Sequence, residues 1–282
     1  MIKFGPAGTA DSFKALGYKD STSLPEYLSS FSLNAFEYQC GRGVNVNKDK
    51  AAILNKGFSE KGITVSLHSP YYISLSSVEK EKRDKSIDYI LQSARAVKML
   101  GGKRIVVHSG SCSKISREEA LALAKETLSS AYMALKENNL SDVHICPETM
   151  GKINQLGTLN EVIELCKVND SFIPCIDFGH LNARTLGSIK AINDYEDILN
   201  MIENELGYDR LKVFHSHFSK IEYSAGGEVR HLTFADDKFG PSPEVLMELI
   251  FKKNLEPTFI CESAGTQTED AAYMKKCFEA NK

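Results

Sequence analysis

Short apolar runs alternate with amphipathic helical segments along almost the whole chain. Eight β-branched or aromatic runs predict strands, at residues 2–5, 35–39, 63–67, 104–107, 143–147, 173–176, 211–218 and 258–261. Between them, apolar residues recur at three- and four-residue spacing. They predict helices near residues 25–28, 48–61, 78–100, 116–135, 158–168 and 188–206, and after residues 242 and 268.

Eight strands that alternate with about eight helices favour a parallel sheet with right-handed crossovers. Eight repeats predict closure into an α/β fold, a (β/α)₈ TIM barrel, as a single domain over residues 1–282. A length of 282 residues suits such a barrel, which typically needs about 250. In this fold the active site lies at the C-terminal ends of the strands.

Composition narrows the choice of partners and compartment. The formal net charge of −3 argues against wholesale electrostatic binding of nucleic acid, although a local basic surface remains compatible with it. The seven cysteines form no Cys-x-x-Cys pair, so we expect reduced core residues of an intracellular, cytoplasmic protein. No apolar run reaches the roughly 18 residues of a membrane span, and the chain begins as a strand rather than a signal peptide. We expect a monomer.

Residues typical of metal sites lie at or near the C-terminal ends of six of the predicted strands. They are His68, His108, Glu148, Asp177 with His180, His215 with His217, and Glu262. Each one alone has an ordinary structural explanation, such as a helix cap for Asp177 or a surface ion pair for Glu262. Their coincidence at one end of six strands predicts a common site. His144 lies in mid-strand, and we interpret it as structural.

Imidazole and carboxylate ligands without cysteine suit Zn²⁺, Mn²⁺ or Fe²⁺. With His231 added, the candidates number about eight, whereas a single metal uses three or four protein ligands. The sequence therefore predicts two or three metals. Bridging carboxylates can hold two such cations about 3.5–4 Å apart, the arrangement that clamps the attacking and leaving oxygens in phosphoester hydrolysis.

The order of these motifs resembles a known family. The segments are His68-Ser-Pro-Tyr-Tyr-Ile-Ser-Leu-Ser, Val-Val-His108-Ser-Gly, Pro-Glu148-Thr, Asp177-Phe-Gly-His180, His215, Arg230-His231 and Cys-Glu262-Ser. Together they resemble the endonuclease IV family, apurinic/apyrimidinic endonucleases of the xylose isomerase-like barrel superfamily. The resemblance covers nearly the whole chain.

The resemblance implies a trinuclear zinc site. It assigns His68, His108 and Glu148 to the first metal. The second would take Glu148, Asp177, His215 and Glu262, and the third His180 and His231. The family's third site also has an Asp two residues before the last His, and this chain has Val229 there. Glu228 could replace that Asp if the loop shifts by one residue, His217 could do so from the preceding strand, or the ligand is missing.

The activity implied is zinc-dependent hydrolysis of the phosphodiester 5′ to abasic sites in double-stranded DNA, a step of base excision repair. Glu148 would be catalytic as the bridging ligand, and Glu262 by orienting the attacking water. Tyr71 falls where the family places a tyrosine near the abasic sugar, and Arg42 is a candidate to enter the gap in the duplex. The cations Arg42, Arg184, Lys220 and Arg230 fall in strand-end loops, where they could bind phosphates.

Two other functions stay open. A sugar isomerase or epimerase of the same superfamily needs only one or two metals, which leaves His68, His108 and His231 without a role. A protein that binds abasic DNA without cutting it would account for the altered acid at the third site.

Overall fold

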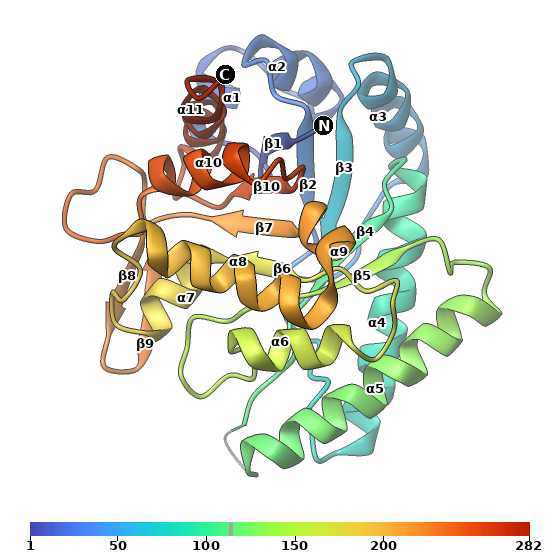
Figure 1. Cartoon of the computed structure of the whole chain (residues 1–282). Coiled ribbons are helices and arrows are strands. Elements are labelled where there is room, and N and C mark those ends of the chain that lie inside the picture. The colour runs from blue at the N-terminus through green and yellow to red at the C-terminus, as the bar shows by residue number, and fades with distance from the viewer. Residues whose placement is uncertain (113–114) are drawn as a thin grey trace.

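The computed structural model describes residues 1–112 and 115–282, and its strands form a barrel surrounded by helices (Figure 1). The barrel strands are β1 (Lys3–Pro6), β2 (Ala35–Gln39), β3 (Thr64–His68), β4 (Arg104–Val107), β5 (His144–Pro147), β6 (Cys175–Asp177), β7 (His215–Phe218) and β10 (Thr258–Cys261). They form two parallel sheets, in the orders β1-β10-β7-β6 and β2-β3-β4-β5. The parallel bridges Ala7–Glu37 and Glu148–Cys175 join the two sheets and close the ring. The predicted (β/α)₈ barrel is therefore confirmed.

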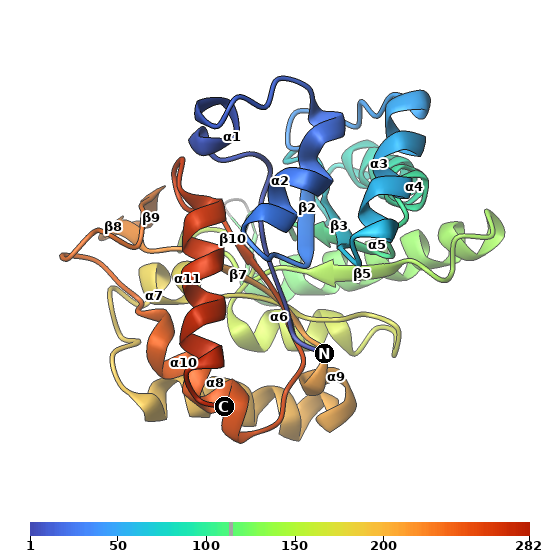
Figure 2. The same ribbon diagram turned by 90° about the horizontal axis from the view of Figure 1, so that it is seen from above.

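The helices cover the outside of the strands in both views (Figure 1 and Figure 2). They are α1 (Asp11–Ala15), η1 (Ser21–Ser23), α2 (Leu24–Ser30), α3 (Lys48–Glu60), α4 (Lys80–Met99), α5 (Arg117–Glu137), α6 (Leu159–Cys166), α7 (Phe178–Arg184), α8 (Ile192–Leu206), α9 (Tyr208–Lys212), α10 (Pro243–Lys252) and α11 (Gln267–Glu279). In the described part of the chain, none of them combines the length and apolarity that a bilayer span requires.

Side-chain caps fix where several helices begin. The predicted capping box before α5 is confirmed, because Ser116 accepts from the backbone N–H of Glu119 while the Glu119 carboxylate accepts from that of Ser116. Thr158 and Glu161 form the same pair at the start of α6. These caps satisfy backbone donors that the first turn leaves unpaired.

Aromatic packing joins α3 to β2 and β1 to β10. The rings of Phe36 and Phe58 stack at 5.6 Å between β2 and α3, and Phe4 stacks on Phe259 at 5.7 Å between β1 and β10. Gly5 allows β1 to approach β2, since a Cβ there would lie 1.8 Å from the carbonyl oxygen of Ala35. All seven cysteines are free, and most are buried, which agrees with the prediction of reduced core residues.

The structure differs from the prediction around the seventh strand. Residues 211 and 212 end α9 instead of starting a strand, and β7 begins only at His215. The sequence pattern also missed an antiparallel hairpin, β8 (Ile221–Ser224) and β9 (Gly227–His231). This hairpin lies on the side toward which the arrow of β7 points (Figure 1), so it borders the C-terminal mouth of the barrel.

Candidate metal centre

The candidate ligands converge on a cavity of about 380 Å³ at the C-terminal mouth of the barrel. His68 ends β3 and Asp177 ends β6, while Glu148 and Glu262 directly follow β5 and β10. Because parallel strands present their C-terminal ends on one side, these side chains meet there. The cavity is lined by His68, Tyr71, His108, Met150, Lys152, Gln155, His180, Glu228, His231 and Glu262.

Glu148 belongs to two ligand groups. In the first, its Oε2 lies 3.5 Å from Nε2 of His68 and 3.0 Å from Nε2 of His108. In the second, its Oε1 lies 2.9 Å from Nδ1 of His217, and that nitrogen lies 3.6 Å from Oε2 of Glu262. Asp177 completes the second group, in which all ligand atoms lie within 4.8 Å of one another. One carboxylate thus connects two sets of ligands.

The third group contains His180, Glu228 and His231. Oxygens of Glu228 lie 3.4 Å from Nε2 of His180 and 3.8 Å from Nε2 of His231. In a regular strand, residues three apart face opposite sides. Here Glu222 pairs with Arg230 and Tyr223 with Glu228, so Val229 has no partner and forms a bulge. The extra residue lets Glu228 and His231 face the same cavity.

Among the sequence-based alternatives for the third site, the structure therefore places Glu228 beside His180 and His231. His217 lies in the second group instead, where the family resemblance implies His215. This grouping favours His217 over His215 as the ligand beside Glu148, Asp177 and Glu262. Nε2 of His215 bonds to Glu37 at 2.9 Å, one pair of residues deeper in the barrel, where its only ligand-type group is with His217 and Cys175 among the described residues. The other seven predicted ligands all fall in the three groups described above.

Protein groups hold one ring nitrogen of three of these histidines. Nδ1 of His68 donates to the carbonyl oxygen of Ser69 at 2.8 Å, and Nδ1 of His180 donates to that of Thr149 at 2.9 Å. Nδ1 of His231 bonds to the hydroxyl of Ser219 at 2.8 Å. Since a carbonyl only accepts, Nε2 of His68 and of His180 is the nitrogen that has the lone pair whenever the ring is neutral. Metal-binding histidines are typically oriented in this way.

The donor set fits divalent cations. Oε2 of Glu148 and Oδ2 of Asp177 are buried, and the imidazole nitrogens of His108 and His180 lie 3.0 and 3.2 Å from them without hydrogen-bond geometry. Buried carboxylate oxygens normally have partners, so these two call for a cation. The other oxygen of Asp177 caps α7 by accepting from the backbone N–H of His180 at 2.8 Å. Asp177 therefore is the helix cap that the ordinary structural explanation proposed, and still offers a free oxygen to the cavity.

Without a cation, protons balance the charges of this cluster. Burial alone would raise the pKa of Glu148, but the imidazoles of His217 and His108 outweigh it and hold that pKa well below its usual range. Burial opposes protonation of His180, yet the carboxylates of Asp177 and Glu148 raise its pKa to about 10. Burial and the neighbouring Glu262 raise the pKa of Asp177, despite the opposing imidazole of His180. A cation that binds here must displace protons from imidazole.

Tyr71 forms one wall of the cavity. Its ring lies 5.2 Å from that of His68 and 5.4 Å from that of His108, and 56% of the residue is exposed. Gly41 makes this position possible, since a Cβ at residue 41 would lie 2.3 Å from the tyrosine ring. Burial of the hydroxyl and the charge of Glu262 raise the pKa of Tyr71 to about 12, so it stays a neutral phenol.

Three of the four cations expected to face phosphates have other partners. Arg184 donates to the carbonyls of Met150, Ile153 and Gln155. Lys220 donates to the carbonyl of Asp236, and Arg230 pairs with Glu222. Arg42 is exposed and makes no ion pair with a described residue. The structure adds Lys152, a cavity-lining lysine on the loop after β5 that was not among the sequence candidates.

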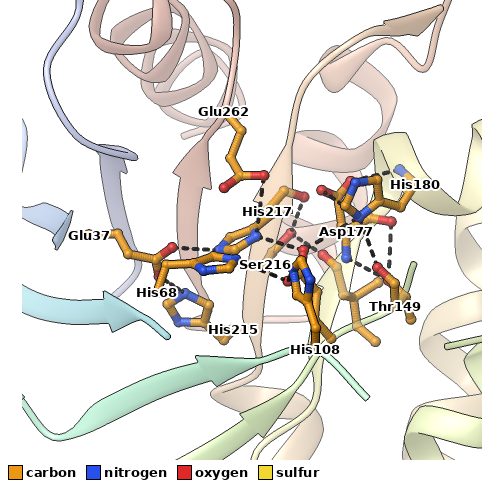
Figure 3. Close-up of polar contacts among 12 residues, drawn as sticks. Glu37, His68, His108, Thr149, Asp177, His180, His215, Ser216, His217 and Glu262 are labelled. Atoms are coloured by element: carbon orange, nitrogen blue, oxygen red, sulfur yellow. Dashed lines mark hydrogen bonds and ion pairs between the residues drawn. The ribbon is translucent and has the colours of Figure 1, made fainter. Parts of the chain in front are cut away.

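Figure 3 shows how the centre is layered. His217 lies between Glu37 on one side and Asp177 and His180 on the other, and Glu262 points toward it from above. Glu37 was not among the sequence candidates. The signal available was a carboxylate in the middle of the apolar run Ala35-Phe36-Glu37-Tyr38, because an acid in such a run is rarely buried without partners.

Comparisons with known proteins agree with this geometry. A family model described as a xylose isomerase-like TIM barrel matches residues 25–277. An uncharacterized protein of Methanocaldococcus jannaschii is 34% identical over 99% of this chain and 97% of its own length. A probable endonuclease 4 of Mycoplasma pneumoniae is 30% identical, and one of Staphylococcus carnosus is 27% identical. The matches to these two cover 63% and 64% of this chain, and 60% of each relative's length.

Solved structures share the fold at low sequence identity. Endonuclease IV from Thermus thermophilus superposes with a TM-score of 0.68 at 19% identity, over 99% of this chain and 98% of that one. A D-tagatose 3-epimerase-like protein gives a TM-score of 0.73 at 17% identity, with the same coverage. At such identities these neighbours establish the fold alone.

Proposed function

Since the chain belongs to the xylose isomerase-like TIM barrel family, we propose that it is an endonuclease IV-like enzyme that hydrolyses the phosphodiester 5′ to abasic sites in duplex DNA. The observation that carries this proposal is the sharing of Glu148 between two ligand groups, with a third group beside them. A site for one metal would need only one of these groups. The probable endonuclease 4 relatives support the same reaction class.

The ligand chemistry points to zinc, two or three ions per chain, with manganese or iron as possible substitutes. The three groups described above would hold them. When bound, such cations make water nucleophilic near neutral pH and neutralise charge on the phosphoryl and leaving oxygens. The residues of the chain then have the tasks of positioning the substrate and handling protons.

Each residue's task follows from its place. Glu148, fully buried, fixes the separation of the two ligand groups that it joins. Glu262 is partly exposed at the cavity and adjoins Nδ1 of His217, so it can orient a water at the rim of the second group. Tyr71 offers an exposed aromatic face beside His68 and His108 for a sugar without a base. An abasic nucleotide has no base to unstack, so its extrusion toward this face costs little.

Positive charge for the phosphates would come from Arg42 and Lys152. Both are exposed, and neither is held by an ion pair within the described residues. Lys152 lines the cavity itself, on a loop whose backbone bridges to Gly227 of the hairpin. The overall charge of −3 requires such local contacts, because the protein as a whole does not attract a polyanion.

The test combines metal content per chain with cleavage of a duplex that carries one tetrahydrofuran abasic analogue. The analogue cannot undergo β-elimination, so a cut means hydrolysis. We expect two or three zinc ions per chain and a cut on the 5′ side. Glu148→Gln and Glu262→Gln should lose nearly all cleavage while unfolding at the wild-type urea concentration. Wild-type cleavage by either variant would contradict this assignment of the site.

A sugar epimerase is the second candidate, and one observation favours it. Glu148, Asp177, His217 and Glu262 form a complete set for a single metal without help from the other two groups. Under this alternative the protein would turn over ketoses and leave abasic DNA uncut. A protein with its full metal content that binds abasic DNA tightly without cutting it would instead be a binding protein.

A further inference from the structure

The carboxylate of Glu37 lies inside the barrel, where solvent does not reach it. The amide of Gln39 donates to its Oε1 at 3.4 Å, and three closer donors surround it. The hydroxyl of Ser66 donates to Oε2 at 2.8 Å, Nε2 of His215 bonds to the same oxygen at 2.9 Å, and Nε2 of His217 lies 2.8 Å from Oε1. A buried carboxylate is costly unless it is paired and hydrogen-bonded. The placement of Glu37 between two imidazoles therefore calls for a reason.

The neighbouring histidines suggest what that reason is. His68, His180 and His231 each have Nδ1 held by a backbone carbonyl or a hydroxyl, while Nε2 faces a carboxylate of the cavity. His217 has the reverse arrangement: Nδ1 faces Glu148 and Glu262, and Nε2 faces Glu37. No other described residue offers an acceptor to that Nε2, and the contact with Glu37 is short but not linear.

We propose that Glu37 is a positioning residue for the metal centre. Its carboxylate accepts the Nε2–H groups of both His215 and His217, and this leaves Nδ1 of His217 as a lone pair for a divalent cation shared with Glu148, Asp177 and Glu262. The inference rests on the metal-binding part of the proposed function. It does not depend on which substrate is turned over.

The two-histidine arrangement explains why a carboxylate is needed. Two N–H groups approach Glu37 from different sides, and a carboxylate has an acceptor oxygen for each. An amide has one acceptor oxygen and one NH₂ donor. After Glu37→Gln, one of the two histidines must turn a lone pair toward the NH₂ group and carry its proton on Nδ1 instead. The bond from His215 is the better aligned of the two, so we expect His217 to be the histidine that turns. The nitrogen of His217 that faces Glu148 can then no longer bind a metal.

The test measures metal affinity by chelator competition with zinc alone. It also measures the protonated ring nitrogen of each histidine by ¹⁵N NMR of the metal-free protein, at a pH at which the ring of His217 is neutral. We expect Glu37→Gln to weaken binding of one metal by about 10- to 100-fold, as removal of such supporting partners typically does. The NMR signal of His217 should move from the Nε2–H form to the Nδ1–H form. Ser66→Ala is the matched control, because it removes a bond to the same carboxylate and keeps both of its acceptor oxygens. It should bind zinc within about threefold of the wild type.

A double variant separates positioning from a purely structural role. In E37Q/H215N the carbonyl oxygen of the new side chain at position 215 can accept from the glutamine NH₂ group. The glutamine oxygen is then free to accept Nε2–H of His217, so zinc affinity should recover toward the wild type. Wild-type affinity in E37Q, or a loss that E37Q/H215N does not recover, would overturn the inference. If E37Q does not fold, Glu37→Asp serves in its place. It keeps two acceptor oxygens, so it should keep His217 in the Nε2–H form, and the Nδ1–H form would refute the proposal.

Both readouts are taken without DNA. Failure to cut abasic DNA by a protein that binds zinc as expected would therefore contradict the proposed function alone. A wild-type protein that takes up no metal would overturn both.

Discussion

Replacing Arg184 by methionine should destabilise the protein by about 2 kcal/mol. It should leave the number of contacts between the protein and DNA phosphates unchanged. The guanidinium donates to the carbonyls of Met150 at 2.8 Å, Ile153 at 3.0 Å and Gln155 at 2.8 Å. These carbonyls belong to the loop after β5, which brings Lys152 to the cavity. The sequence had suggested Arg184 as a phosphate ligand, and the structure assigns it to the loop instead.

The magnitude follows from how these bonds are shared. Arg117 also donates to Ile153 at 3.1 Å and to Gln155 at 3.0 Å, so those two carbonyls keep a partner when Arg184 is lost. Met150 loses the guanidinium that its carbonyl accepts from. A hydrogen bond from a charged group contributes about 1.5–3 kcal/mol. The loss is reduced because burial and the nearby Arg117 both lower the pKa of Arg184, which means that its charge is held unfavourably.

The assay is urea unfolding at equal zinc concentration, with the free-energy difference taken from the shift in midpoint. Arg95→Met is the control. It also removes one positive charge, but Arg95 is exposed on α4 and its side chain bonds to the exposed Asn138, so its change should stay within about 0.5 kcal/mol. The salt dependence of binding to abasic DNA should have the same slope in both variants. The reasoning would be refuted if R184M unfolds at the wild-type urea midpoint and its salt-dependence slope falls by about one, the amount that one lost phosphate contact causes.

Three further predictions follow from the cavity. Deleting Val229 should leave the metal content per chain unchanged, because Glu228 and His231 would then be two residues apart on one face of a regular strand. Glu228→Gln should instead lose about one metal per chain, and elemental analysis measures both variants. In metal-free protein the folded state raises the pKa of His180 from 6.5 to about 10, so its protonation stabilises the fold fully below pH 6.5. The urea concentration at the unfolding midpoint should therefore decrease as the pH is raised from 7 to 10, and a constant midpoint would argue against this. Lys152→Gln should raise KM for abasic duplex several-fold at unchanged melting temperature, and an unchanged KM would exclude a phosphate contact.

The barrel and the convergence of its ligands could be predicted because they depend on repetition. A strand that is buried on both faces reads as a mostly apolar run, so its C-terminal end can be recognised in the sequence. His68 is the last residue of β3, and Glu148 and Glu262 are the first residues after β5 and β10. In a parallel barrel such ends share one mouth, so sequence position alone brought these residues together.

The choice between His215 and His217 required depth as well as direction. The two residues lie two apart in β7, so both point to the same face of the strand. Register separates them: His215 is level with Cys175, and His217 is level with Asp177, at the end of β6. Only the upper one reaches the cavity ligands. The predicted strand began four residues too early, at residue 211, and so gave no measure of this depth.

The inner layer of the barrel gives the strongest reason to regard the centre as built for cations. TIM barrels are usually filled by branched apolar side chains. Here Glu37, Ser66 and His215 occupy the layer below the ligands, fully or almost fully buried. Replacing buried ionic groups by apolar ones is often neutral or stabilising, so this layer gains little for the fold itself. Its contact with the cavity is through His217, whose ring connects Glu37 below to Glu148 above. We therefore attribute the polar layer to the positioning of His217 proposed above rather than to stability.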